Sequence, residues 1–168
     1  RMLKCLKEKI NIYTKEEKIN QKPINVQLAY SGGMDSSCLL DALIKLKSKN
    51  DINLFITYIN YSTSNYSNEV CGYIDSINID NAKKNILNVK IDDRLNFESE
   101  ARKVRYNFLK KIHHNNNIDL TFTAHHLNDQ IETIIMKFLD GSDYISMQGI
   151  RKKYEFILLV IALAYNGS

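Results

Sequence analysis

Residues 30–37 read Tyr-Ser-Gly-Gly-Met-Asp-Ser-Ser and follow directly after the apolar segment 24–29. A short strand that leads into Ser-Gly-Gly and then into a helical pattern is the layout of a phosphate-binding turn. Two glycines permit backbone conformations and close approaches that side chains would block. The helix after the turn offers free N–H groups and the positive end of its dipole to an anion. No Gly-Lys-Ser/Thr follows, so this is not the Walker pattern. A plain tight turn with a serine helix cap is the alternative interpretation.

The rest of the chain alternates between helical and strand patterns. Apolar residues at helical spacing predict helices over 2–19, 34–47, 65–79, 97–113 and 127–139, and short apolar, β-branched runs predict strands over 24–29, 53–61, 85–91, 119–124 and 155–162. This order predicts an α/β fold of the Rossmann-like, doubly wound type, with a mainly parallel sheet and helices on both faces. Ligands of such sheets bind beyond the carboxyl ends of the strands, where the glycine turn lies.

Length and composition indicate one globular domain. The chain has 168 residues and a net charge of +4, which permits a polyanionic partner without requiring one. We expect an amphipathic helix over 1–22, packed on an ATP-binding catalytic domain over 23–168. The three cysteines are isolated, which predicts reduced thiols and a cytoplasmic location rather than a thiolate metal site. The apolar run 156–164 is too short to span a bilayer, so no membrane association is expected.

A second polar cluster lies at residues 123–133, Thr-Ala-His-His-Leu-Asn-Asp-Gln-Ile-Glu-Thr. The predicted helix would place Asp129 and Glu132 in its first turn, with His125 at the preceding strand end. Carboxylates of this kind bind Mg²⁺, and an imidazole transfers protons near neutral pH. Each residue also has a structural interpretation, because an aspartate in a first turn stabilises the helix dipole without chemistry.

A third cluster, residues 96–106, reads Asn-Phe-Glu-Ser-Glu-Ala-Arg-Lys-Val-Arg-Tyr. Arg102 and Arg105 are three residues apart and are predicted to project from one flank of a helix. A guanidinium binds phosphate oxygens with two hydrogen bonds, so this pair is a candidate for the α-phosphate or for RNA. The alternative is an ordinary solvated helix face. We expect the buried stripe of this helix to contain Phe97, Ala101, Val104, Phe108 and Ile112.

Taken together, the three clusters resemble those of the tRNA(Ile)-lysidine synthases, a branch of the pyrophosphate-loop (PP-loop) ATPases. The resemblance covers roughly residues 24–150, in order and at compatible spacing. The matching positions are Ser31-Gly32-Gly33-x-Asp35-Ser36, Asn96-x-Glu98-x-x-Ala101-Arg102-x-x-Arg105-Tyr106 and His125-His126-x-Asn128-Asp129-Gln130-x-Glu132-Thr133. The family's usual His, Leu and Arg after the second strand are Tyr61, Thr63 and Ser64 here, and its later Arg and Gly are Asp140 and Asp143.

The resemblance implies a carbon–nitrogen ligase of tRNA modification that uses ATP and Mg²⁺. Its substrates would be L-lysine and the wobble cytidine of a CAU-anticodon tRNA(Ile), and its products lysidine, AMP and pyrophosphate. A homodimer and a chain that lacks carboxy-terminal tRNA-binding domains are left open. The residues implied to bind ATP are Ser31, Gly32, Gly33, Met34, Asp35, Ser36 and Ser37. Those implied in catalysis are Asp35, Asp129, Arg102, Arg105 and His125, and those implied to bind metal are Asp35, Asp129 and Glu132.

Two alternatives share this fold. PP-loop enzymes of tRNA 2-thiolation have a similar glycine loop and a His-His element, but their sulfur chemistry generally uses paired cysteines. A non-catalytic module would bind ATP and leave it intact. Either histidine or aspartate, His125 or Asp129, would serve as the base that deprotonates lysine, and the sequence does not choose between them.

Overall fold

A computed structural model of the chain describes residues 2–16, 18–49, 51–80, 82–92, 94, 96–127 and 130–136. Within these ranges, the side chains at 2, 5, 9, 13, 16, 35, 124–127 and 130–136 lie outside the description. All structural statements below refer to this part of the chain.

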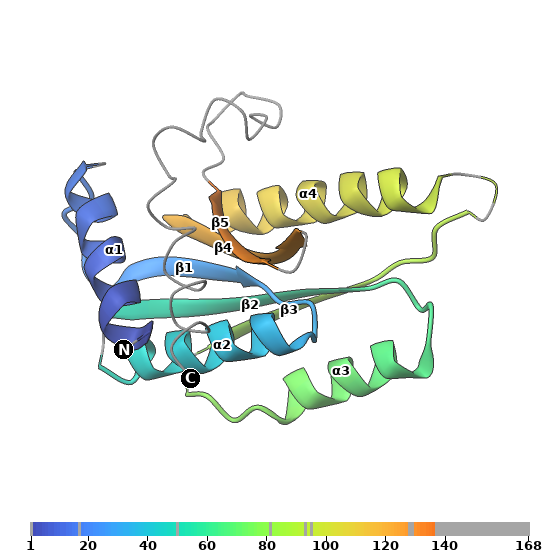
Figure 1. The fold of residues 1–168 in the computed structure, drawn as a ribbon, viewed down its shortest axis with the longest axis horizontal. Helices are drawn as coiled ribbons and strands as arrows, with labels where there is room; N and C mark the ends of the chain where they lie inside the picture. Colours follow the sequence, from blue (N-terminus) through green and yellow to red (C-terminus); the bar gives the residue numbers. More distant parts are fainter. Residues whose placement is uncertain are drawn as a thin grey trace.

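The centre of the molecule is a five-stranded sheet in the order β3-β2-β1-β4-β5 (Figure 1). The strands are β1 (Ile24–Ala29), β2 (Ile52–Asn60), β3 (Lys83–Asn88), β4 (Leu120–Leu127) and β5 (Gln130–Met136). The first four run parallel to one another, and β5 pairs antiparallel with β4. The chain moves from β1 outward to β2 and β3 and then crosses to the other side of β1. The prediction of a doubly wound, mainly parallel sheet is therefore confirmed.

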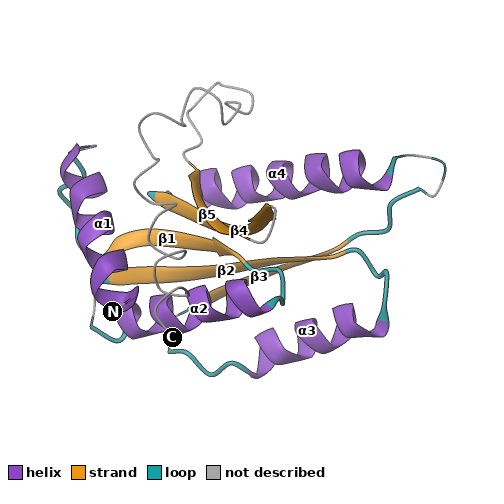
Figure 2. Cartoon of the chain, viewed as in Figure 1, coloured by secondary structure: helices purple, strands orange, loops and turns teal. Residues whose placement is uncertain are grey.

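Helices cover both faces of the sheet, as Figure 2 shows. Helices α2 (Met34–Lys47) and α3 (Asn65–Ser76) lie on one face, and α4 (Phe97–Asn115) lies on the other. Helix α1 (Met2–Glu16) packs against α2, and its Leu6 and Ile10 belong to the main core. None of the helices in the described residues has the length and apolar character that crossing a bilayer requires.

The main core lies between the sheet and α2. It combines the β-strand residues Val26, Leu28, Leu54 and Ile56 with helix residues such as Leu39, Leu40, Leu43 and Leu46, all almost fully buried. The four leucines follow the spacing i, i+1, i+4, i+7, which keeps their side chains on one side of the helix. Both faces of the parallel strands are covered, which explains their nearly continuous burial.

A polar network holds α4 on the opposite face. The Gln27 side chain is fully buried in β1. Its Nε2 donates to the Leu109 carbonyl at 3.2 Å and to Thr121 Oγ1 at 2.9 Å, while Thr57 Oγ1 donates to Gln27 Oε1 at 2.7 Å. One glutamine thus joins three strands to α4, and every polar atom of its side chain is satisfied, as burial requires.

The predicted helix over 127–139 is wrong where the structure describes it. Residues 130–136 form β5, paired with β4 in a register that includes His125 with Glu132. Their Ile131, Ile134 and Ile135 have helical spacing, but β-branched residues also favour strands, and β4 offers an unpaired edge. A short apolar run cannot decide between the two by spacing alone. The predicted strand over 155–162 lies outside the described residues.

The predicted buried stripe of α4 is also partly wrong. Ala101 and Ile112 are buried as expected, but Phe97 is 46% exposed, and Tyr106 and Leu109 are buried instead. The buried side is shifted by about one position because Tyr106 and Leu109 form a buried cluster with Ala29 of β1. Phe97 instead packs edge-to-face on Tyr61, with ring centroids 5.7 Å apart.

Candidate functional site

The glycine loop joins β1 to α2 at the carboxyl edge of the sheet. Tyr30 extends the β1 ladder, because its N–H donates to the Thr57 carbonyl at 2.9 Å. Gly32 has a φ of +82°, and a Cβ there would lie 2.7 Å from Val70 Cγ2. Only glycine combines this backbone conformation with so close an approach of α3. The sequence prediction that glycines set this turn is supported at Gly32.

Serine hydroxyls fix the loop internally. Ser36 Oγ is buried and donates to the Gly33 carbonyl at 3.0 Å, while Ser31 N–H (3.3 Å) and Ser31 Oγ (3.0 Å) donate to Ser36 Oγ. Ser37 Oγ donates to the same Gly33 carbonyl at 2.9 Å. These serine hydroxyls therefore stabilise the shape of the loop, whereas the sequence predicted that they would contact phosphate. Ser36 is only 1% exposed, so its hydroxyl acts on the loop itself.

Helix α2 begins directly after this loop. Gly33 is its N-cap and provides no side-chain cap. The first intrahelical acceptor is the Gly33 carbonyl, which receives the Ser37 N–H at 3.0 Å. The N–H groups of residues 34–36 therefore have no acceptor within the helix. Their position at the positive end of α2 makes the loop an anion site in which the backbone supplies the donors.

A cavity of about 360 Å³ opens beside the loop. It lies over the ends of β1, β2 and β4, where Ala29, Thr57 and Thr123 line it, and this is the point at which the strand order reverses. Ligands of doubly wound sheets bind at this position. Most of the lining side chains carry hydroxyls: Tyr30, Ser31, Thr57, Tyr58, Tyr61, Thr63, Ser64, Tyr66, Ser67 and Thr123. The cavity is thus rich in hydrogen-bonding groups of low charge.

Arg105 is the one charged side chain among the described residues that line this cavity. Its Nε is buried and has no hydrogen-bond partner within the described part of the chain. A buried donor without a partner costs free energy, and a bound acceptor would remove that cost. The tyrosine that replaces the family's histidine holds this arginine: Tyr61 Oη donates to the Ala101 carbonyl at 2.9 Å and is hydrogen-bonded to Arg105.

The pKa shifts of two tyrosines beside the cavity agree with a positive charge on Arg105. Burial raises the pKa of Tyr61, and the charge and hydrogen bond of Arg105 partly offset that rise. Burial likewise raises the pKa of Tyr30, whose hydroxyl hydrogen-bonds with Ser37 at 2.9 Å. Both phenols are neutral near neutral pH, so Arg105 provides a positive charge that no tyrosinate neutralises.

The structure separates the two predicted arginines. Arg102 is exposed, and its guanidinium lies 5.6 Å from the centre of the Tyr106 ring. It is not among the residues that line the cavity. Residues three apart lie about 60° from one another around the helix axis, so the two arginines can share a flank although only Arg105 lines the cavity. Arg105 is the arginine that the structure brings to the site.

The remaining predicted residues are only partly described. Met34 and Asp35 lie in the first turn of α2; Met34 is 73% exposed, and the Asp35 side chain lies outside the description. The backbone of His125 and Glu132 is paired across β4 and β5. Asp129 lies outside the described residues. Within the described side chains, no group of three His, Cys, Asp or Glu residues is placed to hold a metal ion.

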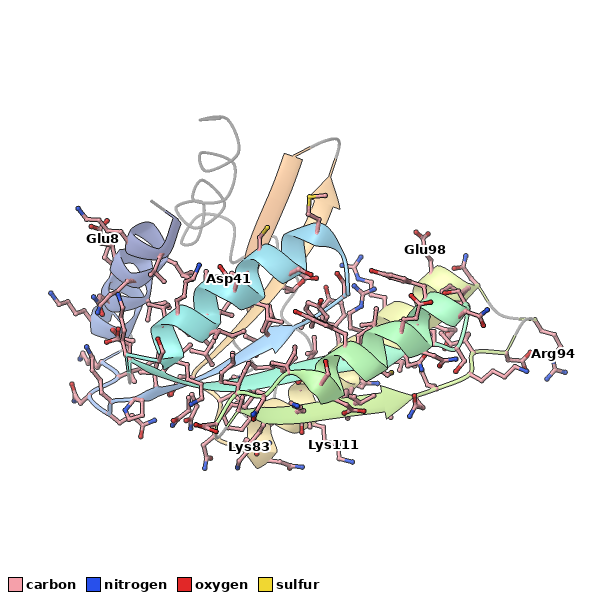
Figure 3. All side chains as sticks on the ribbon, turned by 90° about the horizontal axis from the view of Figure 1, so that it is seen from below. Glu8, Asp41, Lys83, Arg94, Glu98 and Lys111 are labelled. Atoms are coloured by element: carbon pink, nitrogen blue, oxygen red, sulfur yellow. The ribbon has the colours of Figure 1, made fainter. Side chains whose placement is uncertain are left out.

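Sequence reasoning missed several lining residues, above all Thr57, Tyr66 and Thr123. A usable signal existed, since polar residues that follow or end parallel strands meet at one edge of the sheet. Far from this edge, Figure 3 shows Arg94 at the tip of the loop between β3 and α4, and Lys83 and Lys111 projecting on another side. These charges do not line the cavity.

Comparison with known proteins addresses the chain as a whole. The family model described as "PP-loop domain" matches residues 3–162. The chain belongs to this PP-loop family. Family membership implies ATP as the bound nucleotide, in agreement with the glycine loop and the cavity beside it.

Relatives of this PP-loop chain carry a common name. A protein of Streptococcus gordonii named tRNA(Ile)-lysidine synthase is 36% identical over 135 residues, 78% of this chain and 30% of that relative. Proteins of the same name from Enterococcus faecalis and Blochmanniella pennsylvanica are 28% and 34% identical, over 84% and 74% of this chain. The chain spans about a third of the length of the curated relatives it matches.

Proposed function

We propose that this chain is the ATP-binding catalytic part of a tRNA(Ile)-lysidine synthase, a ligase that forms a carbon–nitrogen bond. The observation that carries the proposal is the pairing of an amide-lined glycine loop with the partnerless donor of Arg105 at one cavity. The name shared by its relatives supports the choice of reaction.

The proposed reaction has two steps. The C2 oxygen of the wobble cytidine attacks the α-phosphorus of ATP, the bond from that phosphorus to the bridging oxygen breaks, and pyrophosphate leaves. The ε-amine of lysine then attacks C2, the bond from C2 to the adenylate oxygen breaks, and AMP leaves. A lysine amine has an ordinary pKa near 10.4, so it must lose a proton to a base before it attacks.

The described residues have defined parts in this reaction. The amides at the start of α2 would bind the pyrophosphate and so stabilise it as a leaving group. Arg105 would stabilise the charge that develops at the α-phosphate, which is usually the largest contribution in phosphate chemistry. Tyr61 would keep the guanidinium in place through its hydrogen bond. Arg102, lying over Tyr106, would contribute less.

The other assignments remain proposals from the sequence. Asp35, Asp129 and Glu132 are proposed to bind Mg²⁺, which would neutralise phosphate charge, and His125 or Asp129 is proposed as the base. L-lysine, a CAU-anticodon tRNA(Ile) and a homodimer belong to the same proposal, as does the division into an N-terminal helix over 1–22 and a catalytic domain over 23–168.

The test supplies the chain with ATP, Mg²⁺, labelled lysine and a CAU-anticodon transcript. We expect label in the RNA, and AMP with pyrophosphate as products. The matched control is the same transcript with uridine in place of the wobble cytidine, which should stay unlabelled. In a parallel reaction with sulfide in place of lysine, incorporation of sulfur into the RNA would favour a thiolation enzyme. ATP that is bound but left whole in both reactions would favour a non-catalytic module.

A further inference from the structure

Helix α3 contacts the glycine loop through three side chains of one helix face. Tyr66 Oη donates a hydrogen bond to the Gly32 carbonyl at 2.8 Å. Val70 packs against the Gly32 Cα so closely that a Cβ there would overlap it. The Tyr73 ring lies against Tyr30, with centroids 6.3 Å apart. The spacing i, i+4, i+7 places these three side chains in a row along α3. The loop therefore rests on α3 as well as on its own serines.

The hydrogen bond from Tyr66 fixes the orientation of one peptide plane. In a trans peptide, the Gly32 carbonyl and the Gly33 N–H point in opposite directions. With the carbonyl held by Tyr66, the Gly33 N–H turns to the other side, where it donates a hydrogen bond of 3.3 Å to Ser31 Oγ, and Ser31 lines the cavity. Both flanking residues are glycines, for which a flip of this peptide meets little steric resistance. The long 3.3 Å bond to Ser31 holds one side of this peptide, and the 2.8 Å bond from Tyr66 holds the other.

The position of Tyr66 suits it to hold the Gly32–Gly33 peptide more than to stabilise the core. It is 55% exposed, so it contributes less to the core than Val70 or Ile74 on the same helix. It also lines the cavity, which brings its ring next to any molecule bound there. Its hydroxyl contact joins residues 34 positions apart in the sequence. A half-exposed tyrosine with one long-range hydrogen bond to a functional loop has its main effect on that loop.

We propose that Tyr66 is a positioning residue for the pyrophosphate part of the nucleotide. It acts through the Gly32–Gly33 peptide, which it holds with the Gly33 N–H toward the anion. The inference rests on the proposed role of the glycine loop. A purely structural contact would not affect one part of the nucleotide selectively. This inference predicts that loss of the Tyr66 hydroxyl weakens binding of the phosphates and leaves binding of the nucleoside unchanged.

The experiment measures binding of pyrophosphate, ATP and adenosine to the full chain by titration calorimetry, for wild type, Tyr66→Phe and Tyr73→Phe. Tyr66→Phe keeps the ring and removes the hydroxyl. Its affinity for pyrophosphate and ATP should fall roughly three- to tenfold, the effect of one neutral hydrogen bond, with adenosine binding unchanged. Tyr73→Phe removes a hydroxyl from the same helix and should bind all three ligands like wild type. Thermal unfolding of the three proteins verifies that each is folded.

Three outcomes would overturn the inference. In the first, Tyr66→Phe binds pyrophosphate as tightly as wild type does. In the second, it loses pyrophosphate and adenosine affinity to the same extent. In the third, Tyr73→Phe shows the same selective loss. The binding assay contains neither lysine nor tRNA, so its result does not depend on whether the chain forms lysidine. Lysidine formation is tested by the labelling experiment above. A wild-type chain that binds no pyrophosphate overturns both this inference and the proposed role of the loop.

Discussion

The glycine loop and helix α4 contribute to the same cavity by different physical means. The loop uses backbone amides, and its shape comes mostly from contacts within residues 30–37. Helix α4 contributes one cationic side chain, Arg105, and its position depends on residues far away in the sequence. Gln27 holds the Leu109 carbonyl, and Tyr61 holds the Ala101 carbonyl and the guanidinium. The serine hydrogen bonds of the loop are thus local, although α3 also holds Gly32, whereas the placement of Arg105 depends on tertiary contacts throughout.

The largest effect is expected from removal of the positive charge on α4. Arg105→Met keeps an unbranched apolar stem but removes the guanidinium, and it should slow pyrophosphate release from ATP by about 10²–10³-fold, the cost of losing a preorganised charge-stabilising donor. The rate is measured with lysine and the CAU-anticodon transcript present. Arg102→Met is the matched control, three residues away and exposed, and should retain most of the activity. If Arg102→Met released pyrophosphate more slowly than Arg105→Met, Arg105 would not be the arginine that stabilises the α-phosphate.

A smaller effect should follow from a change in the loop backbone. Gly32→Ala forces an alanine to a φ of +82° against Val70. Backbone strain of about 1–3 kcal/mol should displace the loop and weaken ATP binding roughly ten- to hundredfold.

The control for Gly32 is Gly72→Ala on α3, where a new Cβ would meet nothing within 4 Å. That variant should bind ATP normally and unfold at a slightly higher temperature, because alanine favours a helix over glycine by up to about 1 kcal/mol. Equal ATP affinity of the two alanine variants would contradict the account of the loop.

The tertiary connection to α4 can be tested through stability. Gln27→Leu leaves the Thr57 hydroxyl and the Leu109 carbonyl without their partner, which should lower the free energy of unfolding by about 1–3 kcal/mol. Urea denaturation measures the change. Gln21→Leu removes only an exposed hydrogen bond to Asp119 and should have little effect. If Gln27→Leu were as stable as Gln21→Leu, the network would not be what holds α4.

The smallest effect concerns an exposed ion pair far from the cavity. Hydrogen bonds from the Arg94 side chain, and then from its backbone, lower the pKa of the Asp92 carboxyl. Because the folded-state pKa is lowered, the contribution of this pair to stability is present above the ordinary pKa of aspartate and is lost as the pH falls through the lowered value. In Arg94→Ala, an NMR titration should find a higher pKa for Asp92, with nucleotide binding unchanged. An unchanged pKa would mean that the pair does not form in solution.

The difference between the two sides of the site also explains what the sequence could predict. The strand over 24–29 and the helix over 34–47 were predicted with the bounds that the structure has, because their apolar spacing and the glycines between them are local signals. The role of Arg105 over Arg102 was not predictable, since it depends on the rotation of α4 against Ala29 and Gln27. No local pattern encodes that rotation.

In the segment after β4, a local signal was present but predicted the wrong structure. Its isoleucines at 131, 134 and 135 fit a helix by spacing, yet the backbone of 130–136 pairs with β4. Pairing to an open sheet edge is a tertiary effect that outweighs a short periodic signal. The predicted placement of Asp129 and Glu132 in a first helical turn depended on that helix, whereas His125 was predicted at a strand end. The side chains of all three lie outside the described residues, so their roles stay proposals.

The most direct test of the account is a crystal structure of the chain with α,β-methylene-ATP, in which the bond that the reaction breaks is replaced by a stable one. We predict the terminal phosphates against the amides of residues 33–36 and the α-phosphate within hydrogen-bond distance of Arg105. A nucleotide bound elsewhere, or phosphates that contact neither the loop nor Arg105, would contradict the central claim.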